Sequence, residues 1–317
     1  MTNNSSVDGP DSQTVLNQII IEYMREKKRK RFWRWVKGIT ISLIVLWGIY
    51  QVASLHFDDV NERTKPHVGL IELKGNIFDA QAADADNFSK GMDKAYANKQ
   101  LKAVMLRIDS PGGSPVQADY MYNLVQYYRK KHPEIKIYAV CVDVCASAAY
   151  FVAASADEIY ANPSSLVGSI GVLYNGFGFV DAMQKLGVSR RLQTAGRNKG
   201  FLDQFSPVDE AQEKILQTML DLIHQQFIDK VKAGRGTRLH IDDDTFSGLF
   251  WTGIQAKERG LIDGFASPGQ LARDIIKIDR IVDYTHQQSV LERVAKNIGT
   301  AMASELPIAM GVKPGFQ

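Results

Sequence analysis

The sequence predicts an α/β fold with a largely parallel sheet, preceded by a single N-terminal transmembrane helix. After residue 66, short apolar runs alternate with segments of helical periodicity, which is the pattern of parallel strands joined by helices. Before residue 56 lies an apolar run of about twenty residues that directly follows a basic block. The 317 residues, 45% of them hydrophobic, are enough to bury one large core.

Residues 1–35 are expected to form a cytoplasmic tail that ends in a basic block. Eight residues between Arg25 and Lys37 are Lys or Arg, and Glu26 alone is acidic. Because cations collect on the cytoplasmic side of a membrane span, this block orients the N-terminus toward the cytoplasm. The same rule explains the block without nucleic acid, so no nucleic-acid partner is expected.

The transmembrane anchor is predicted over residues 36–55, a length that crosses a hydrocarbon core of about 30 Å as a helix. Trp35, Trp47 and Tyr50 are residue types that favour the membrane interface. The alternatives are a cleavable signal peptide and a buried core helix. The late start of the run, its flanking cations and the lack of a clear cleavage site favour an uncleaved anchor. The chain is therefore expected in the cell (inner) membrane, with its remainder periplasmic or otherwise extracytoplasmic.

After a charged linker at 56–66, one folded domain is predicted over 67–285, followed by a C-terminal helix and tail over 286–317. Its strands are expected at 68–73, 103–109, 137–143, 158–161 and near 189–194. Its helices are expected at 116–131, from about 147, at 207–233 with Ser206 as N-cap, and at 288–304.

Several chemistries are excluded by missing motifs. The six histidines show no metal-ligand spacing, and the chain contains neither GxGxxG nor GxxxxGK[ST], so no metal and no cofactor are expected. The two cysteines, Cys141 and Cys145, are too few for a disulfide framework. They are interpreted as small buried thiols, with a local disulfide as the alternative.

Two turns of small residues follow predicted strands. Pro111-Gly112-Gly113 comes after strand 103–109, and its glycines can leave backbone N–H groups directed at one point. Ser147 comes after strand 137–143 at the start of an apolar helix, where the Ala148 N–H can stabilise an oxyanion. The first segment can also be a simple turn, and Ser147 a simple helix cap. The ends of parallel strands share one crevice, which favours a common site.

A reactive serine needs a base, and no histidine has a supporting context. A lysine can serve if burial lowers its pKa toward neutrality. Lys199 lies in TAGRNKGF (194–201), after a predicted strand and between glycines and an aromatic residue. A solvated loop lysine is the alternative.

Four segments together resemble a family of serine peptidases, that of signal peptide peptidase A, SohB-like proteins and protease IV, in its short form. They are IDSPGG (108–113), CASAAYFVAASADEIYANPSSLVGSIGV (145–172), TAGRNK (194–199) and WTGIQAKERGLIDGFAS (251–267). The resemblance covers about residues 66–270. Ala148-Ala149 depart from the Gly-Gly or Gly-Ala that is common in the family after the serine.

The resemblance implies a ClpP/crotonase-like fold and a Ser-Lys dyad, with Ser147 as nucleophile and Lys199 as general base. It assigns Ser169 to orienting the lysine, and the Gly113 and Ala148 amides to the oxyanion hole. It further implies a membrane-anchored endopeptidase that degrades remnant signal peptides after their release from preproteins. Members assemble as homo-oligomers in which neighbouring subunits share each active site.

Two rival functions remain open from the sequence. A crotonase acting on a coenzyme A thioester could use the same turns to hold an enolate, but a membrane anchor gives such an enzyme no advantage. A catalytically silent membrane scaffold could retain the fold and bind a partner.

Overall fold

The computed structural model describes residues 12–286, apart from the side chains of 12–19, 49 and 52–61. The chain divides into two compact units, Met1–Asn61 and Glu62–Gln317, which are described separately. The helix expected at 288–304 lies outside the described residues.

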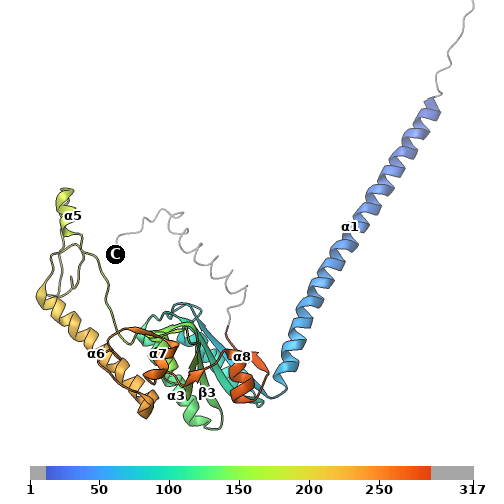
Figure 1. Cartoon of the computed structure of the whole chain (residues 1–317). Coiled ribbons are helices and arrows are strands. Elements are labelled where there is room, and N and C mark those ends of the chain that lie inside the picture. The colour runs from blue at the N-terminus through green and yellow to red at the C-terminus, as the bar shows by residue number, and fades with distance from the viewer. Residues whose placement is uncertain (1–11, 287–317) are drawn as a thin grey trace, which may run out of the picture. The chain divides into compact units, whose positions relative to one another are not determined.

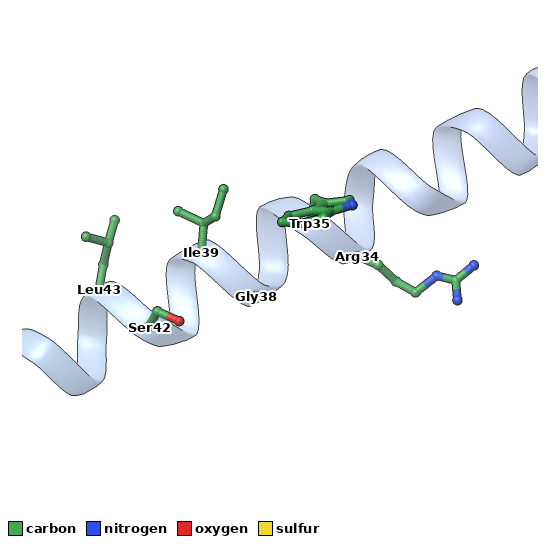
Figure 2. A pocket seen from close by; sticks show the side chains of 6 residues that line it. All are labelled: Arg34, Trp35, Gly38, Ile39, Ser42 and Leu43. Atoms are coloured by element: carbon green, nitrogen blue, oxygen red, sulfur yellow. The ribbon is translucent and has the colours of Figure 1, made fainter.

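The first unit contains a single long helix. Helix α1, Ser12–Arg63, joins the predicted tail from Ser12 on, the predicted span and most of the predicted linker into one element. Large apolar side chains along it are exposed, and Figure 2 shows Trp35, Ile39 and Leu43 on one face of the helix. Among the described residues, no helical stretch is both long and apolar enough to cross a membrane. Residues 52–55 of the predicted span have side chains outside that description.

The second unit is built on one sheet of eight strands (Figure 1). Its main path runs β6-β5-β3-β2-β1-β8, with β4 paired to β3 and β7 paired to β4. All pairs are parallel except β5 with β6. The prediction of an α/β fold with a largely parallel sheet is therefore confirmed. The strands are β1 (His67–Lys74), β2 (Leu101–Ser110), β3 (Lys136–Ala146), β4 (Glu158–Ala161), β5 (Leu166–Gly168), β6 (Phe250–Thr252), β7 (Gly264–Phe265) and β8 (Ile281–Asp283).

Helices surround this sheet and project from it. They are α2 (Ala85–Tyr96), α3 (Pro115–Lys131), α4 (Ala148–Ala153), α5 (Val180–Lys185), α6 (Glu210–Arg235), α7 (Gly253–Glu258) and α8 (Pro268–Gln270), with a 3-10 turn at Gly236–Arg238 and a π-helix at Leu271–Ile276. Helix α4 is buried along its whole length, which its apolar sequence AAYFVA permits. The hydroxyl of Tyr150 in α4 donates to the Leu261 carbonyl at 2.8 Å, and burial raises the pKa of this tyrosine.

The C-terminal end of α6 is fixed to the core by an ion pair. The fully buried Arg235 donates to both carboxylate oxygens of Asp263, at 2.7 and 3.0 Å, and to the Gly260 carbonyl at 2.9 Å. Asp263 also accepts from the Ile159 N–H of β4 at 2.7 Å. Burial acts to raise the pKa of Asp263, but the hydrogen bond and charge of Arg235 outweigh it and lower that pKa. The pair thus joins α6, β4 and the loop before β7.

Two element predictions are wrong. The strand expected near 189–194 is absent from the described residues, since this segment is exposed and pairs with no strand of the sheet. Helix α6 begins at Glu210 rather than at 207, because Asp209 supplies the cap: its side chain accepts from the N–H groups of Ala211 and Gln212. The other predicted strands, at 68–73, 103–109, 137–143 and 158–161, are confirmed with ends within three residues.

Candidate active site

The two small-residue turns predicted from the sequence meet at one end of the sheet. Strands β2 and β3 are parallel neighbours, and each leads directly into its turn. A Cβ placed on Gly112 would lie 2.7 Å from the Ser147 Cβ and 3.0 Å from the Ala148 nitrogen. With a φ of 108°, Gly112 also adopts a backbone conformation that strains other residues. Glycine is required here because the first turn lies directly against the second.

The N–H of Gly113 is directed by the hydrogen bonds on either side of it. Ile77 N–H donates to the Gly112 carbonyl at 2.9 Å, and Ser114 N–H donates to the Ile77 carbonyl at 2.7 Å. In such a parallel bridge the central residue points its own N–H to the opposite side, away from Ile77 and toward β3. The Gly113 N–H therefore faces the side on which Ser147 lies.

Ser147 occupies a strained position between β3 and α4. Its φ of 54° and ψ of −126° are rare for a residue with a side chain, and strain of this kind costs on the order of 1–3 kcal/mol. It stands at the N-cap position, but its side chain makes no capping hydrogen bond. The helix-cap alternative is therefore excluded for its hydroxyl. The next residue, Ala148, opens α4, and the first N–H of a helix has no acceptor within the helix.

Ser169 lies beside Ser147 because β5 runs parallel to β3. The register pairs Ala146 with Gly168, and the Ser147 N–H donates to the Gly168 carbonyl at 2.8 Å. Ser169 has a φ of 50°, a second strained position in the same crevice. Its own N–H donates to the Leu249 carbonyl at 2.8 Å, which holds the turn from the side of β6.

These residues line a cavity of about 850 Å³. Of the predicted site residues, Ser147, Gly113, Ala148 and Ser169 all lie in its wall. The remaining wall is mostly apolar, formed by Phe78, Phe151, Val172, Leu173, Ile223 and Phe227. The cavity can therefore take an apolar side chain next to a serine hydroxyl and two directed N–H groups.

Lys199 is not brought to this cavity within one chain. It is exposed and lies in a projecting segment, residues 172–209, here called the arm. Figure 1 shows the arm with α5 standing out from the sheet at the far end of α6. Nearly every side chain from Leu173 to Lys199 is exposed, including Leu173 at 81%, Phe177 at 73% and Leu186 at 78%.

His224 is a cavity residue that the sequence reasoning missed. It lies on α6, one turn before the buried Phe227, and its Nε2 makes a 3.0 Å hydrogen bond with the Ile170 carbonyl. Ile223 and Phe227 are four residues apart and His224 and Phe227 three apart, so all three lie on one face of a helix. This spacing was the sequence signal that could have identified His224.

Cys141 and Cys145 are free thiols, both buried. The favoured interpretation of two buried thiols is thus confirmed against a disulfide. Burial, followed by a hydrogen bond with Cys141, raises the pKa of the Cys145 thiol well above its usual range, so it is not a candidate nucleophile.

Two family models match this chain. Peptidase family S49 matches residues 129–275, which include Ser147, Ser169 and Lys199. The Clp protease model matches residues 70–167, which include both strand-end turns.

Curated relatives were found in several organisms. A putative protease of Synechocystis sp. is 30% identical over 256 residues, which cover 74% of this chain and 89% of the relative. The putative signal peptide peptidase SppA of Enterococcus faecium is 26% identical, over 67% of this chain and 61% of the relative. A Na(+)/H(+) antiporter NhaA of Brucella abortus is 40% identical over 228 residues, which cover 71% of this chain but 30% of the antiporter. The chain thus spans less than two thirds of the antiporter and of the Enterococcus protein.

Proposed function

The chain belongs to peptidase family S49 and is of the SppA type, and from this premise we propose that it is a serine endopeptidase with Ser147 as nucleophile and Lys199 as general base. One observation carries the proposal: the strained Ser147 lies against the Gly112-Gly113 turn in the wall of an apolar cavity. Positioned oxyanion donors usually supply a large part of the rate enhancement in acyl transfer.

In the proposed first step, the neutral amine of Lys199 accepts the hydroxyl proton of Ser147 while the Ser147 oxygen attacks the scissile carbonyl carbon. The negative charge that forms on the carbonyl oxygen is stabilised by the N–H groups of Gly113 and Ala148. Lys199 then gives its proton to the leaving amine, and the peptide bond breaks to leave an ester on Ser147.

In the second step Lys199 takes a proton from a water molecule, whose oxygen attacks the ester carbonyl. The bond to the Ser147 oxygen then breaks, Lys199 returns the proton to that oxygen, and the acyl fragment leaves with a new carboxyl group. The Ser169 hydroxyl oxygen accepts a hydrogen bond from the Lys199 amine and so orients the amine beside Ser147. The chemistry needs neither a metal nor a cofactor.

Lys199 is proposed to reach the cavity of a neighbouring copy in a homo-oligomer. Its exposed place on the arm supports this, as do the large apolar side chains of the arm that the described residues leave uncovered. The arrangement makes oligomerisation a condition of catalysis.

The substrates are proposed to be signal peptides left in the membrane after their release from preproteins. The name of the Enterococcus relative, a putative signal peptide peptidase, and the mostly apolar wall of the cavity support this. Residues 36–55, which include no acidic side chain, are proposed as the anchor, with the basic block on the cytoplasmic side and the peptidase domain extracytoplasmic.

The proposal is tested by labelling the detergent-solubilised full chain with a fluorophosphonate probe. The expected result is labelling of wild type, no labelling of Ser147→Ala and weak labelling of Lys199→Ala. An equal mixture of the two variants is expected to regain labelling, because a subunit with Ser147 can meet one with Lys199.

Labelling of Ser147→Ala at the wild-type level would contradict the nucleophile assignment. Peptide cleavage by Lys199→Ala at full rate would contradict the base. If the probe did not label the wild-type protein, the crotonase or scaffold alternative would be favoured instead.

A further inference from the structure

His224 connects α6 to the turn that follows β5. A carbonyl oxygen only accepts hydrogen bonds, so the 3.0 Å contact with Ile170 requires a hydrogen on the His224 Nε2. Ile170 directly follows Ser169, and its side chain is fully buried. The imidazole therefore holds the backbone of the turn at the residue after Ser169.

The same hydrogen bond joins the two segments that the arm connects. The cavity wall includes Gly171, Val172 and Leu173 where the arm begins, and Ile223 and His224 where α6 returns from the arm. The hydrogen bond joins Ile170, two residues before the arm, to the part of α6 that first meets the cavity. Two segments 54 residues apart in the sequence are thus fixed to each other at this point.

Helix α6 is held by the core only beyond this point. Its buried residues are Phe227, Val231 and Arg235, and the Phe227 ring packs 4.9 Å from Phe151 of α4. Toward its N-terminus the helix exposes Leu222 at 68% and Met219 at 50%. Helix α6 therefore leaves the core near His224, and Figure 1 shows α6 extending toward α5 of the arm.

The turn that His224 holds needs support, because Ser169 has a positive φ of 50°. The Ser169 N–H donates to the carbonyl of Leu249, the residue before β6. Within the turn, the Gly171 N–H donates to the Ser169 carbonyl at 2.9 Å. His224 supplies the contact from α6. Without it, the turn would lose its connection to the element that carries the arm.

We propose that His224 is a positioning residue of this active site: its Nε2–H hydrogen bond to Ile170 fixes the Ser169 turn and the base of the Lys199 arm relative to each other. The inference rests on the proposed Ser147 and Lys199 chemistry. In this proposal His224 acts through the donor on its Nε2 and not as the base, and His224→Gln separates the two roles because Gln keeps a donor but has no basic nitrogen.

The test compares His224→Phe, which keeps ring volume but loses the donor, with His224→Gln, which keeps a donor but cannot act as a base. Each variant is assayed as the full chain in detergent with a fluorogenic apolar peptide. His240→Phe is the matched control, because His240 also bonds a carbonyl, that of Glu258 at 2.7 Å, but is exposed and outside the cavity wall.

For His224→Phe we expect kcat to fall about tenfold, the effect of about one lost hydrogen bond, with KM within about twofold of wild type. For His224→Gln we expect kcat within about threefold of wild type, and for His240→Phe no change. Hydrogen exchange of the amides at 168–171 should be faster in His224→Phe than in wild type.

Wild-type kcat in His224→Phe would overturn the proposal, and so would equal losses in His224→Phe and His224→Gln. Melting temperatures show whether a lost activity reflects unfolding. If His224→Phe does unfold, the activity of His224→Gln still tests whether a donor at this position is sufficient. Failure of the Ser147 and Lys199 chemistry would show differently, as activity that survives in Ser147→Ala.

Discussion

The two halves of the proposed dyad belong to regions of opposite character. Ser147 lies in a region where glycines touch neighbouring backbone, strained residues are held by several hydrogen bonds, and α4 behind it is wholly buried. Lys199 lies on the arm, where most side chains are exposed and the large apolar Leu173, Phe177 and Leu186 are left uncovered by the described residues. The first region is packed within a single chain. The second exposes large apolar side chains, as surfaces that bind other molecules often do.

The two regions should respond differently to mutation. Substitutions near Ser147 must disturb backbone that is already close-packed, so they affect folding and activity together. Substitutions on the arm leave the core untouched, so they should affect activity or assembly alone. The predictions below use this difference, and each substitution is paired with a matched control variant.

The largest effect is expected for Lys199→Ala. Loss of a general base costs about 10²–10⁴-fold in rate, so kcat should fall by about that factor. The melting temperature should stay at the wild-type value, because the side chain is exposed. Lys185→Ala, another exposed lysine of the arm, is the control and should retain full activity. Equal losses in both variants would point to the charge of the arm rather than to a base.

The next effect is expected for Gly112→Ala. The new Cβ would lie 2.7 Å from the Ser147 Cβ at a φ of 108°, so both a steric clash and backbone strain oppose it. We expect a loss of about 3 kcal/mol in unfolding free energy, with little peptidase activity left. Gly178→Ala on the arm meets nothing within 4 Å and should change stability by less than about 0.5 kcal/mol. Denaturant titration of both variants checks this, and similar stabilities would disprove the close packing of the turn.

The sequence predicted the core far better than the arm. The strands before Gly112 and Ser147 are largely apolar and end in turns of small residues, so the sequence predicts a common site for Gly113, Ser147 and Ala148. Ser169 was assigned by the family resemblance, and all four residues line one cavity. On the arm the sequence predicted a strand near 189–194 that the described residues do not contain, because a strand depends on a pairing partner that the local sequence SRRLQT cannot reveal. His224 was missed because its helical spacing to Phe227 was not used, and because the sequence does not show its hydrogen-bond partner, a backbone carbonyl 54 residues away.

A comparable loss of stability is expected for Asp263→Asn. The change leaves the buried Arg235 charge without its partner, and breaking a buried pair in this way costs about 3 kcal/mol. Asp181→Asn, at an exposed carboxylate of the arm, should change stability by less than about 0.5 kcal/mol. Denaturant midpoints measure both, and equal midpoints would show that Arg235 finds other partners.

The same carboxylate should make stability depend on pH. Because the pKa of Asp263 is lower in the folded chain than in the unfolded one, its contribution is present above the unfolded pKa, which is about 4. It is lost as the pH falls through the folded pKa. Between about pH 5 and pH 2, wild type should therefore lose more stability than Asp263→Asn. Parallel acid titration curves for the two proteins would contradict this assignment.

The smallest effect on the fold is expected for Leu186→Ala at the end of α5. This leucine is 78% exposed, so its truncation should change the unfolding free energy by less than about 0.5 kcal/mol. Leu106→Ala, at a fully buried position of β2, should cost about 2–5 kcal/mol. If the arm docks on a second copy as proposed, Leu186→Ala should nevertheless weaken the oligomer in size-exclusion chromatography and lower activity at dilute concentration. A Leu186→Ala oligomer as stable as wild type would place the contact between copies elsewhere, and the exposed apolar side chains of the arm would then need a different partner.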